Sequence, residues 1–404
     1  MYLTGLTHRD ELFNLTVHWL NDDFRPEDGK ILTRIFFYES LLAANCVIPQ
    51  MFDFFRKVYG PLIQTERIFK KQQLRDRLIQ YRPYSTPRIE EIVMAFHENP
   101  EYYFPRLPID AVLIFASGDR LVSMGRVKRL SRVAEKVSYR LIDTLFKQIK
   151  SEAEHIAEKR AAQAGVPVSS LISSPEDMRQ DFVEAETVVA GRLKDRRMHL
   201  KPESLTINDM IGFKIIGEPE ELSHAMDRLR ETFSVVEVQT HSGRYNATNV
   251  AVDLTLPSTD HMMELLKHQD WSLAAARGLD PEVAKKDLPE YLEKGSKVIR
   301  LEVIMTTYPE LIESEIGRSI HELRILRLRD RMVYSGIIAQ NAGYLIEYML
   351  TLAMAPVVTI SELPIKLYGR YLPETIQAAK GNLFHPGMEG SLLDAFCVPS
   401  CIPG

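Results

Sequence analysis

The spacing of hydrophobic residues predicts a mainly helical first part of the chain. Apolar and aromatic side chains recur at helical spacing across residues 1–125, best seen in "KILTRIFFYESLLAANCVIPQMFDFFRKVYGPLI". One helix in this segment is expected to end near Pro49, because proline disrupts a helix interior. Residues 111–119 are consistent with a short buried strand. We therefore expect a mainly helical N-terminal domain over 1–125.

Two helices are predicted next. Over 127–164, Val133, Val137, Leu141, Leu145 and Ile149 recur every four residues and mark one buried face. A second helix begins after Ser174 and runs to about "VVAGRLKDRRM".

The central pattern then changes to strands that alternate with helices. Strands are predicted at 206–217, 233–240, 247–256 and 297–306. A short amphipathic helix (218–233) follows the first strand, and a helical insertion (258–294) precedes the last. A helix starting at Thr307 is expected to carry "LIESEIGRSIHELRILRLRDR", and another spans 336–354. This order predicts a small mixed sheet with helices packed on it, and the alternation alone leaves α+β and α/β open.

Composition limits the class of protein. The 404 residues are 45% hydrophobic and 26% charged, which is typical of a globular protein with two or three domains. The net charge of -5 argues against general nucleic-acid binding. Three cysteines, no signal-peptide pattern, and apolar stretches judged too short to span a bilayer predict a cytoplasmic protein without membrane contact.

Two carboxylates in apolar runs are the clearest candidates for chemistry. Asp209 lies in "LTINDMIGFKII" and Glu302 in "SKVIRLEVIMTT", and both runs have the pattern of buried strands. A carboxylate buried among apolar side chains needs a compensating partner. A metal ion bound to a nucleotide triphosphate would supply one, whereas solvated or salt-bridged strand ends are the structural alternative.

The central block resembles the synthetase domain of the RelA/SpoT-type alarmone synthetases over about 130–335. Four ordered motifs carry the resemblance: "AGRLKDRRM", "NDMIGFKII", "RYNATNVAVDL" and "EVIMTTYPELIESEIGRSIH". The family pattern is Gly-Arg-x-Lys followed by Ser-Ile-x-x-Lys, then Asp with a basic residue five positions later, then Gly-Tyr-x-Ser-x-His, then Glu-Val-Gln-Ile-Arg-Thr with Ala-Glu and a later His. The resemblance implies a nucleotidyltransferase fold and the transfer of pyrophosphate from ATP to the 3′-hydroxyl of GDP or GTP.

The resemblance also implies roles for individual residues. Asp209 and Glu302 would be the catalytic pair and would hold Mg²⁺, which usually takes one or two carboxylates together with substrate phosphates. Nucleotide binding would fall to Arg192, Lys194, Lys214, Tyr245, Asn249, Glu315 and His321. The basic members would contact phosphates, and Tyr245 would stack on guanine.

The chain departs from the family pattern at several positions. Ile304 and Thr306 replace the Gln and Arg of the fourth motif, Ala247 and Asn249 replace the Ser and His of the third, and Lys214 replaces Arg. The Ser-Ile-x-x-Lys stretch is shortened to "DRRM" after Lys194. These changes leave two alternatives open, a degenerate synthetase acting as a nucleotide sensor or interaction module, and a nucleotidyltransferase with another acceptor.

The combined expectation is an α+β protein with a nucleotidyltransferase-like mixed sheet flanked by helices. Its parts would be a helical N-terminal domain (1–125), the RelA/SpoT-like domain (126–356) and a C-terminal tail (357–404). Its partners would be ATP and a guanine nucleotide. The sequence leaves open whether the protein forms a homo-oligomer.

Overall fold

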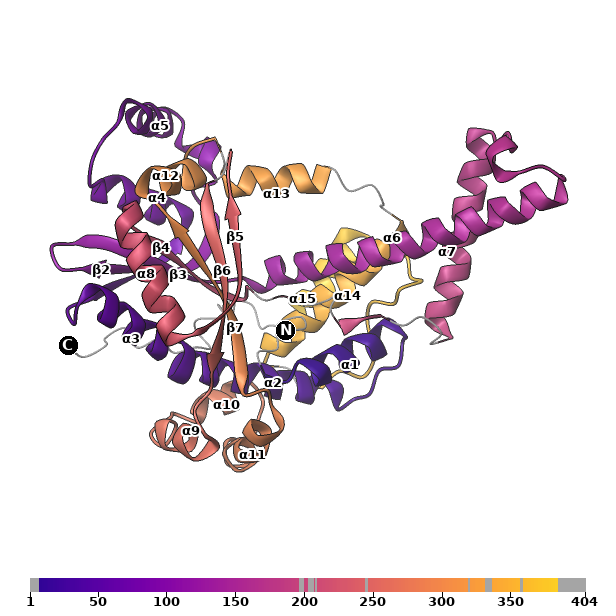
Figure 1. Cartoon of the computed structure of the whole chain (residues 1–404). Coiled ribbons are helices and arrows are strands. Elements are labelled where there is room, and N and C mark those ends of the chain that lie inside the picture. The colour runs from indigo at the N-terminus through magenta and orange to yellow at the C-terminus, as the bar shows by residue number, and fades with distance from the viewer. Residues whose placement is uncertain are drawn as a thin grey trace.

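A seven-stranded mixed sheet with helices around it forms the centre of the protein (Figure 1). The computed structural model describes residues 7–195, 200–202, 207, 209–243, 246–318, 320–330, 336–356 and 359–383. The strand order is β1-β2-β3-β4-β7-β6-β5. The strands are β1 (Gln64–Lys70), β2 (Pro108–Ala116), β3 (Arg120–Val127), β4 (Ile211–Ile216), β5 (Ser234–His241), β6 (Ala247–Thr255) and β7 (Val298–Thr306). This confirms the α+β class and the mixed sheet.

Among the strands that the structure describes, one neighbouring pair is parallel. β4 and β7 run side by side in the same direction, and the other neighbours pair antiparallel. Because β4 and β7 are parallel, both strands start at the same end of the sheet. This arrangement brings segments far apart in the sequence into direct register.

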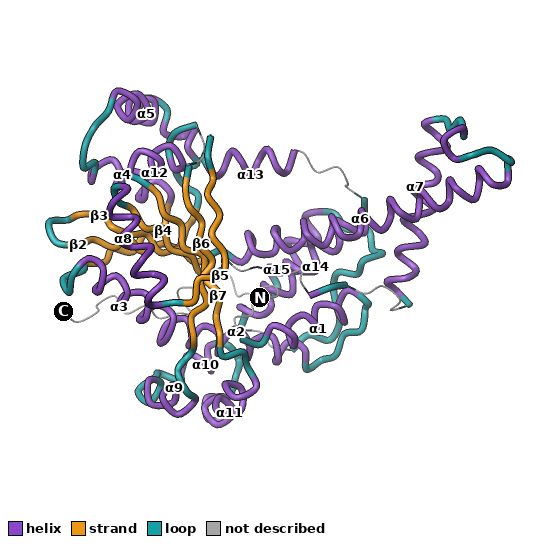
Figure 2. Tube along the Cα trace, in the orientation of Figure 1, coloured by secondary structure: helices purple, strands orange, loops and turns teal. Residues whose placement is uncertain are grey.

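Helices surround the sheet and extend beyond it. They are α1 (Arg9–Leu20), α2 (Asp28–Leu42), α3 (Ile48–Tyr59), α4 (Lys71–Tyr81), α5 (Pro87–Glu98), α6 (Leu130–Gln163), α7 (Pro175–Lys194), α8 (Pro219–Thr232), α9 (Thr259–Leu265), α10 (Ser272–Ala276), α11 (Pro281–Lys294), α12 (Tyr308–Glu315), α13 (His321–Asp330), α14 (Ile337–Met354) and α15 (Pro373–Gly381). Figure 2 shows the far ends of α6 and α7 projecting away from the sheet.

The two faces of the central strands differ in chemistry. On one face, alternate residues such as Ile215, Val303 and Val252 are buried in a large hydrophobic core shared with α1, α2, α3, α6 and α14. On the other face the intervening residues include Lys214 and Glu302. Side chains alternate between the two faces along a strand, which produces this division. The face that carries Lys214 and Glu302 can therefore form a polar site.

The helix through Pro49 does not end where the sequence analysis expected. A π-helical turn at Ala43–Val47 joins α2 to α3, and Pro49 lies in the first turn of α3. Proline is tolerated there, because the π-helical turn changes the hydrogen-bond register directly before Pro49, which has no N–H to donate. The resulting stretch, Asp28–Tyr59, is apolar enough and, at 32 residues, long enough to cross a membrane, so the expectation that all apolar stretches are too short was wrong. About 72% of its most apolar window is buried in the protein, as in an ordinary core helix.

The sheet extends through the expected boundary at residue 125. Strand β3 crosses this position and pairs with β4, so β1, β2 and β3 continue the central sheet. Strands β1 and β3 were not predicted from the sequence. Because β1 is an edge strand with a single buried residue, Ile68, it carries little hydrophobic signal.

The helix expected from Thr307 onward is two helices. α12 ends at Glu315 and α13 begins at His321. At Gly317 an added Cβ would lie 2.7 Å from the Cα of Glu313, so only glycine allows this close approach. The Glu313 carboxylate also accepts a hydrogen bond from the N–H of Arg318 at 2.9 Å. The break places Glu315 and His321 on separate helices.

The expected C-terminal tail contributes to the core. Leu363, Ile365, Leu367 and Ile376 are buried, and the amide of Asn341 on α14 donates to the Leu367 carbonyl at 2.8 Å. The described part of this segment, residues 359–383, therefore packs against the rest of the protein.

Candidate functional site

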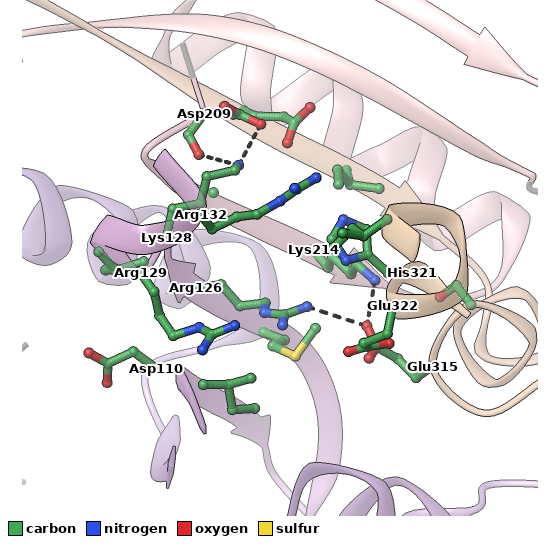
Figure 3. A pocket seen from close by; sticks show the side chains of 18 of the residues that line it. Asp110, Arg126, Lys128, Arg129, Arg132, Asp209, Lys214, Glu315, His321 and Glu322 are labelled. Atoms are coloured by element: carbon green, nitrogen blue, oxygen red, sulfur yellow. Dashed lines mark hydrogen bonds and ion pairs between the residues drawn. The ribbon is translucent and has the colours of Figure 1, made fainter. Parts of the chain in front are cut away.

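A pocket of about 430 Å³ lies over the polar face of the sheet (Figure 3). It is lined from β3, β4, β6 and β7, the start of α6, and the α12–α13 region. Among the described lining residues, eight are Lys or Arg and five are Asp or Glu. This surplus of positive charge suits an anionic ligand.

Strand register explains why distant residues meet in the pocket. Arg126, Gly212, Glu302 and Ala251 lie in one row across β3, β4, β7 and β6. Met124, Lys214, Ile304 and Asn249 form the next row on the same face. Since Gly212 has no side chain and Ala251 a short one, Glu302 is flanked by small neighbours.

Asp209 precedes β4 and is held by two lysines from the β3–α6 segment. Its Oδ2 atom lies 2.5 Å from Nζ of Lys128 and 2.6 Å from Nζ of Lys136. Lys128 also donates to the Asp209 carbonyl at 2.6 Å, as the view in Figure 3 shows. Burial opposes ionisation of Asp209, but the charges of Lys128 and Lys136 outweigh it and lower the pKa to about 2. Burial likewise lowers the pKa of Lys128 to about 8, although Asp209 opposes that shift.

Glu302 faces the pocket next to Asp209. Burial and then the charge of Asp209 raise the pKa of Glu302 above its usual value. The amide nitrogen of Asn249 donates to its Oε1 at 3.2 Å, while Oδ1 of Asn249 is buried without a hydrogen-bond partner in the described structure. Two neighbouring carboxylates and an unpartnered amide oxygen form a set of oxygen donors.

This donor set fits a small divalent cation. Mg²⁺ prefers oxygen ligands and is commonly bound by one or two carboxylates, with substrate phosphates completing its shell. Within the described ranges, no group of three or more His, Cys, Asp or Glu side chains forms a metal cluster. The fit therefore rests on Asp209, Glu302 and Asn249 together with oxygens that a ligand would bring.

Glu315 is present in the pocket wall but is enclosed by cations. Only 1% of its side chain is exposed, and Oε1 accepts from Nζ of Lys214 at 3.0 Å and from Arg126 at 3.5 Å. Figure 3 shows both cations directed at this carboxylate. Glu315 therefore holds these basic side chains in place in the pocket wall.

His321 begins α13 at the pocket rim, where the residue is partly open to solvent. Packing around its ring and then the charges of Arg126 and Lys71 lower its pKa to about 3. The ring is therefore neutral near pH 7 and can either donate or accept a hydrogen bond.

Arg192 lies away from the pocket, contrary to the expectation that it shares the cleft with the acids. Its guanidinium pairs with the carboxylate of Glu152 at 2.5 Å. Glu152 is 16 positions beyond Lys136 on the same helix, which corresponds to about 24 Å along α6. The side chain of Lys194 and the whole of Tyr245 lie outside the described residues.

The basic residues from the end of β3 to the second turn of α6 are a part of the site that was not predicted from the sequence. Arg126, Lys128, Arg129, Arg132 and Lys136 all line the pocket. Positive side chains oppose the macrodipole at a helix N-terminus, so their accumulation there signals an anion site.

A second signal was available in the same segment. The Gly-Arg-x-Lys pattern occurs at 125–128 as well as at 191–194. Gly125 is required by packing, because an added Cβ would lie 2.8 Å from the ring of Phe213 on β4. The copy at 125–128 is the one in the pocket.

Comparisons with protein-family models, curated proteins and solved structures found no match for this chain.

Proposed function

We propose that the pocket binds a nucleoside polyphosphate and that the protein transfers pyrophosphate from ATP to the 3′-hydroxyl of GDP or GTP, as RelA/SpoT-type synthetases do. One observation carries the proposal: Asp209 and Glu302, 93 positions apart, meet in a pocket with a surplus of cations. A polyphosphate needs both the carboxylates, through a metal ion, and the positive charge.

The motif order supports this proposal once the copy at 125–128 is used. Gly125-Arg126-Val127-Lys128 is followed by Arg132-Val133-Ala134-Glu135-Lys136. The second segment matches Ser-Ile-x-x-Lys in its spacing, with Arg in place of Ser and Val in place of Ile. With this alignment the Ser-Ile-x-x-Lys stretch has its full length, and no shortening after Lys194 has to be assumed.

The cationic side chains of the pocket would bind the phosphates. Arg126, Lys128, Arg132, Lys136 and Lys214 line the pocket, and guanidinium and ammonium groups there stabilise charge that develops on the transferred group. Mg²⁺, held by Asp209 and Glu302, would neutralise the ATP phosphates. Tyr245 would stack on guanine.

The chemical step is a displacement at the β-phosphorus of ATP. The 3′-oxygen of the acceptor forms a bond to this phosphorus, the bond from phosphorus to the oxygen shared with the α-phosphate breaks, and AMP leaves. Glu302 would also take the hydroxyl proton. The neutral ring of His321 would contribute a hydrogen bond at the rim.

One feature favours a nucleotide sensor as the second candidate. Ile304 lines the pocket beside Lys214 and Asn249, where the family pattern has a polar Gln. An apolar side chain there removes a hydrogen-bonding group from the acceptor side. A sensor would bind nucleotide in the same pocket without turnover.

Incubation of the protein with labelled ATP, Mg²⁺ and GDP, GTP, GMP or tRNA tests the proposal. We expect AMP and a pyrophosphorylated guanine nucleotide from the wild type. Asp209→Ala should abolish turnover and leave guanine-nucleotide binding intact, because base and metal are held by separate groups.

The results of this experiment distinguish the pyrophosphate transferase from the nucleotide sensor. Binding of ATP or GTP without product from any acceptor would support the sensor. Turnover that survives Asp209→Ala would place the chemistry outside this pocket and overturn both candidates.

A further inference from the structure

Helix α4 places two buried cations at the wall of the pocket, and Lys71 is one of its lining residues. Lys71 and Arg75, one helical turn apart, are 1% and 0% exposed. Nζ of Lys71 lies 2.5 Å from Oε2 of Glu315 and 2.9 Å from Oε1 of Glu322. Arg75 donates to the Glu315 carbonyl at 2.8 Å and approaches Glu322 at 3.4 Å. α4 lies outside the segment that resembles a known family.

Such burial is not explained by stability. Desolvating two charges costs about as much as their attraction returns, so replacing a buried ion pair by apolar residues is often neutral or stabilising. The charges around Glu315 outweigh its burial and keep its pKa well below the usual value, so the carboxylate stays ionised. Lys71, Glu315 and Glu322 of this cluster line the pocket, so we expect a role of the cluster there.

The two oxygens of Glu315 face different partners. Oε2 contacts Lys71 from α4, whereas Oε1 contacts Lys214 from β4 and Arg126 from β3. Lys214 and Arg126 line the pocket. One carboxylate therefore connects a buried helix to two cations that face the ligand space.

We propose that Lys71 is a positioning residue of the pocket, which neutralises Glu315 from below so that Lys214 and Arg126 remain available to an anionic ligand. Without Lys71, the Glu315 charge would be balanced only by Lys214 and Arg126, and both would be drawn from the ligand toward the carboxylate. The proposal rests on the proposed function in one respect, that the ligand is a polyphosphate.

Binding of inorganic tripolyphosphate tests this role through three variants. Lys71→Met should weaken binding roughly tenfold, the effect of losing one charge-assisted contact. Lys71→Met/Glu315→Gln should restore the affinity, because the carboxylate charge that draws in Lys214 and Arg126 is gone. Arg88→Met is the matched control, since Arg88 also holds α12 by an ion pair, to Glu313 at 2.6 Å, and does not line this pocket.

The double variant distinguishes positioning from a merely structural role. A general loss of packing would not be repaired by a second substitution in the same cluster. Unchanged affinity in folded Lys71→Met would overturn the proposal, as would a double variant that binds as weakly as Lys71→Met. If Lys71→Met alone fails to fold, the double variant is compared with the wild type, and a roughly tenfold weaker affinity in the folded double variant overturns the proposal.

A ligand-independent measurement separates this proposal from the function. The rate at which Lys214 is acetylated by an amine-reactive ester, followed by mass spectrometry, reports how tightly its ammonium is held. We expect slower acetylation in Lys71→Met and faster acetylation in the double variant. If the wild type does not bind tripolyphosphate, the proposed function fails. Unchanged acetylation rates would overturn the positioning role by themselves.

Discussion

Oδ2 of Asp209 lies 2.6 Å from Nζ of Lys136, although 73 positions separate the two residues in the sequence. The contact joins the start of β4 to the second turn of α6. This contact places the basic residues at the start of α6 next to Asp209 and Glu302. The pocket therefore contains both positive and negative side chains.

The first prediction compares Lys136 with Arg192. Lys136→Met should weaken ATP binding roughly tenfold or more, because a charge-assisted contact to phosphate is lost. Arg192→Met should leave the affinity unchanged, since Arg192 pairs with Glu152 away from the pocket. Titration calorimetry of both variants checks this. A loss of affinity confined to Arg192→Met would place the phosphates elsewhere.

The second prediction concerns proton transfer by Glu302. Glu302→Gln should lower turnover by about 10²–10⁴-fold, because the amide cannot accept the proton, and should also weaken Mg²⁺-dependent ATP binding, because Glu302 is a proposed ligand of the metal ion. Asp253→Asn is a suitable control, since Asp253 lies on the adjacent strand and pairs with Arg300 at 2.7 Å. Steady-state kinetics gives both quantities. A Glu302→Gln enzyme with normal turnover would remove the base role.

The third prediction is a pH dependence of anion binding. Burial lowers the pKa of Lys128 to about 8, so its ammonium is present below this pH and is lost above it. Affinity for tripolyphosphate should therefore fall as the pH rises through about 8. Lys128→Arg should flatten the profile, because arginine stays protonated. An unchanged slope in this variant would assign the titration to another group.

The fourth prediction concerns stability at the N-terminal end of the fold. Both ring nitrogens of His8 face acceptors, the Glu11 carboxylate at 3.2 Å and the Tyr291 carbonyl at 2.7 Å. Burial opposes protonation, but these two acceptors, together with the charge of Glu39, raise the pKa of His8 above 6.5.

The sign follows from this shift. Since the folded-state pKa lies above the unfolded value, the stabilisation is complete below about pH 6.5 and is lost as pH rises through the folded-state pKa. The melting temperature of the wild type should exceed that of His8→Phe by more at low pH than at high pH. Phenylalanine keeps a ring against Tyr291, on which His8 stacks at 3.6 Å. A difference that grows with pH would contradict the prediction.

The sequence was informative wherever structure follows from local pattern. The alternation of apolar residues predicted β4, β6 and β7 within a few positions, and the four-residue spacing from Val133 to Ile149 predicted α6. Such patterns predict the folded structure well, because each corresponds to one buried face of a helix or strand. Asp209 and Glu302 were noticed for the same reason, as charges that interrupt apolar runs.

Elements whose form depends on their neighbours were misjudged. Pro49 was expected to end a helix, yet the preceding π-helical turn lets the helix continue. The segment β1 forms a strand because it pairs with β2. Gly-Arg-x-Lys was assigned to 191–194, since two copies of a short motif look alike until their positions in space are known.

The sequence by itself determined a mixed sheet with helices packed on it, most of the helices and strands, and two carboxylates that needed a partner. Only the tertiary structure decided which cations serve those carboxylates, that Glu315 faces Lys71 from α4, and that Arg192 lies elsewhere. The physical reason is that a site depends on side chains being placed within a few ångströms of one another. The register of β3, β4, β7 and β6 fixes that placement, and register is set by pairing between segments distant in the chain.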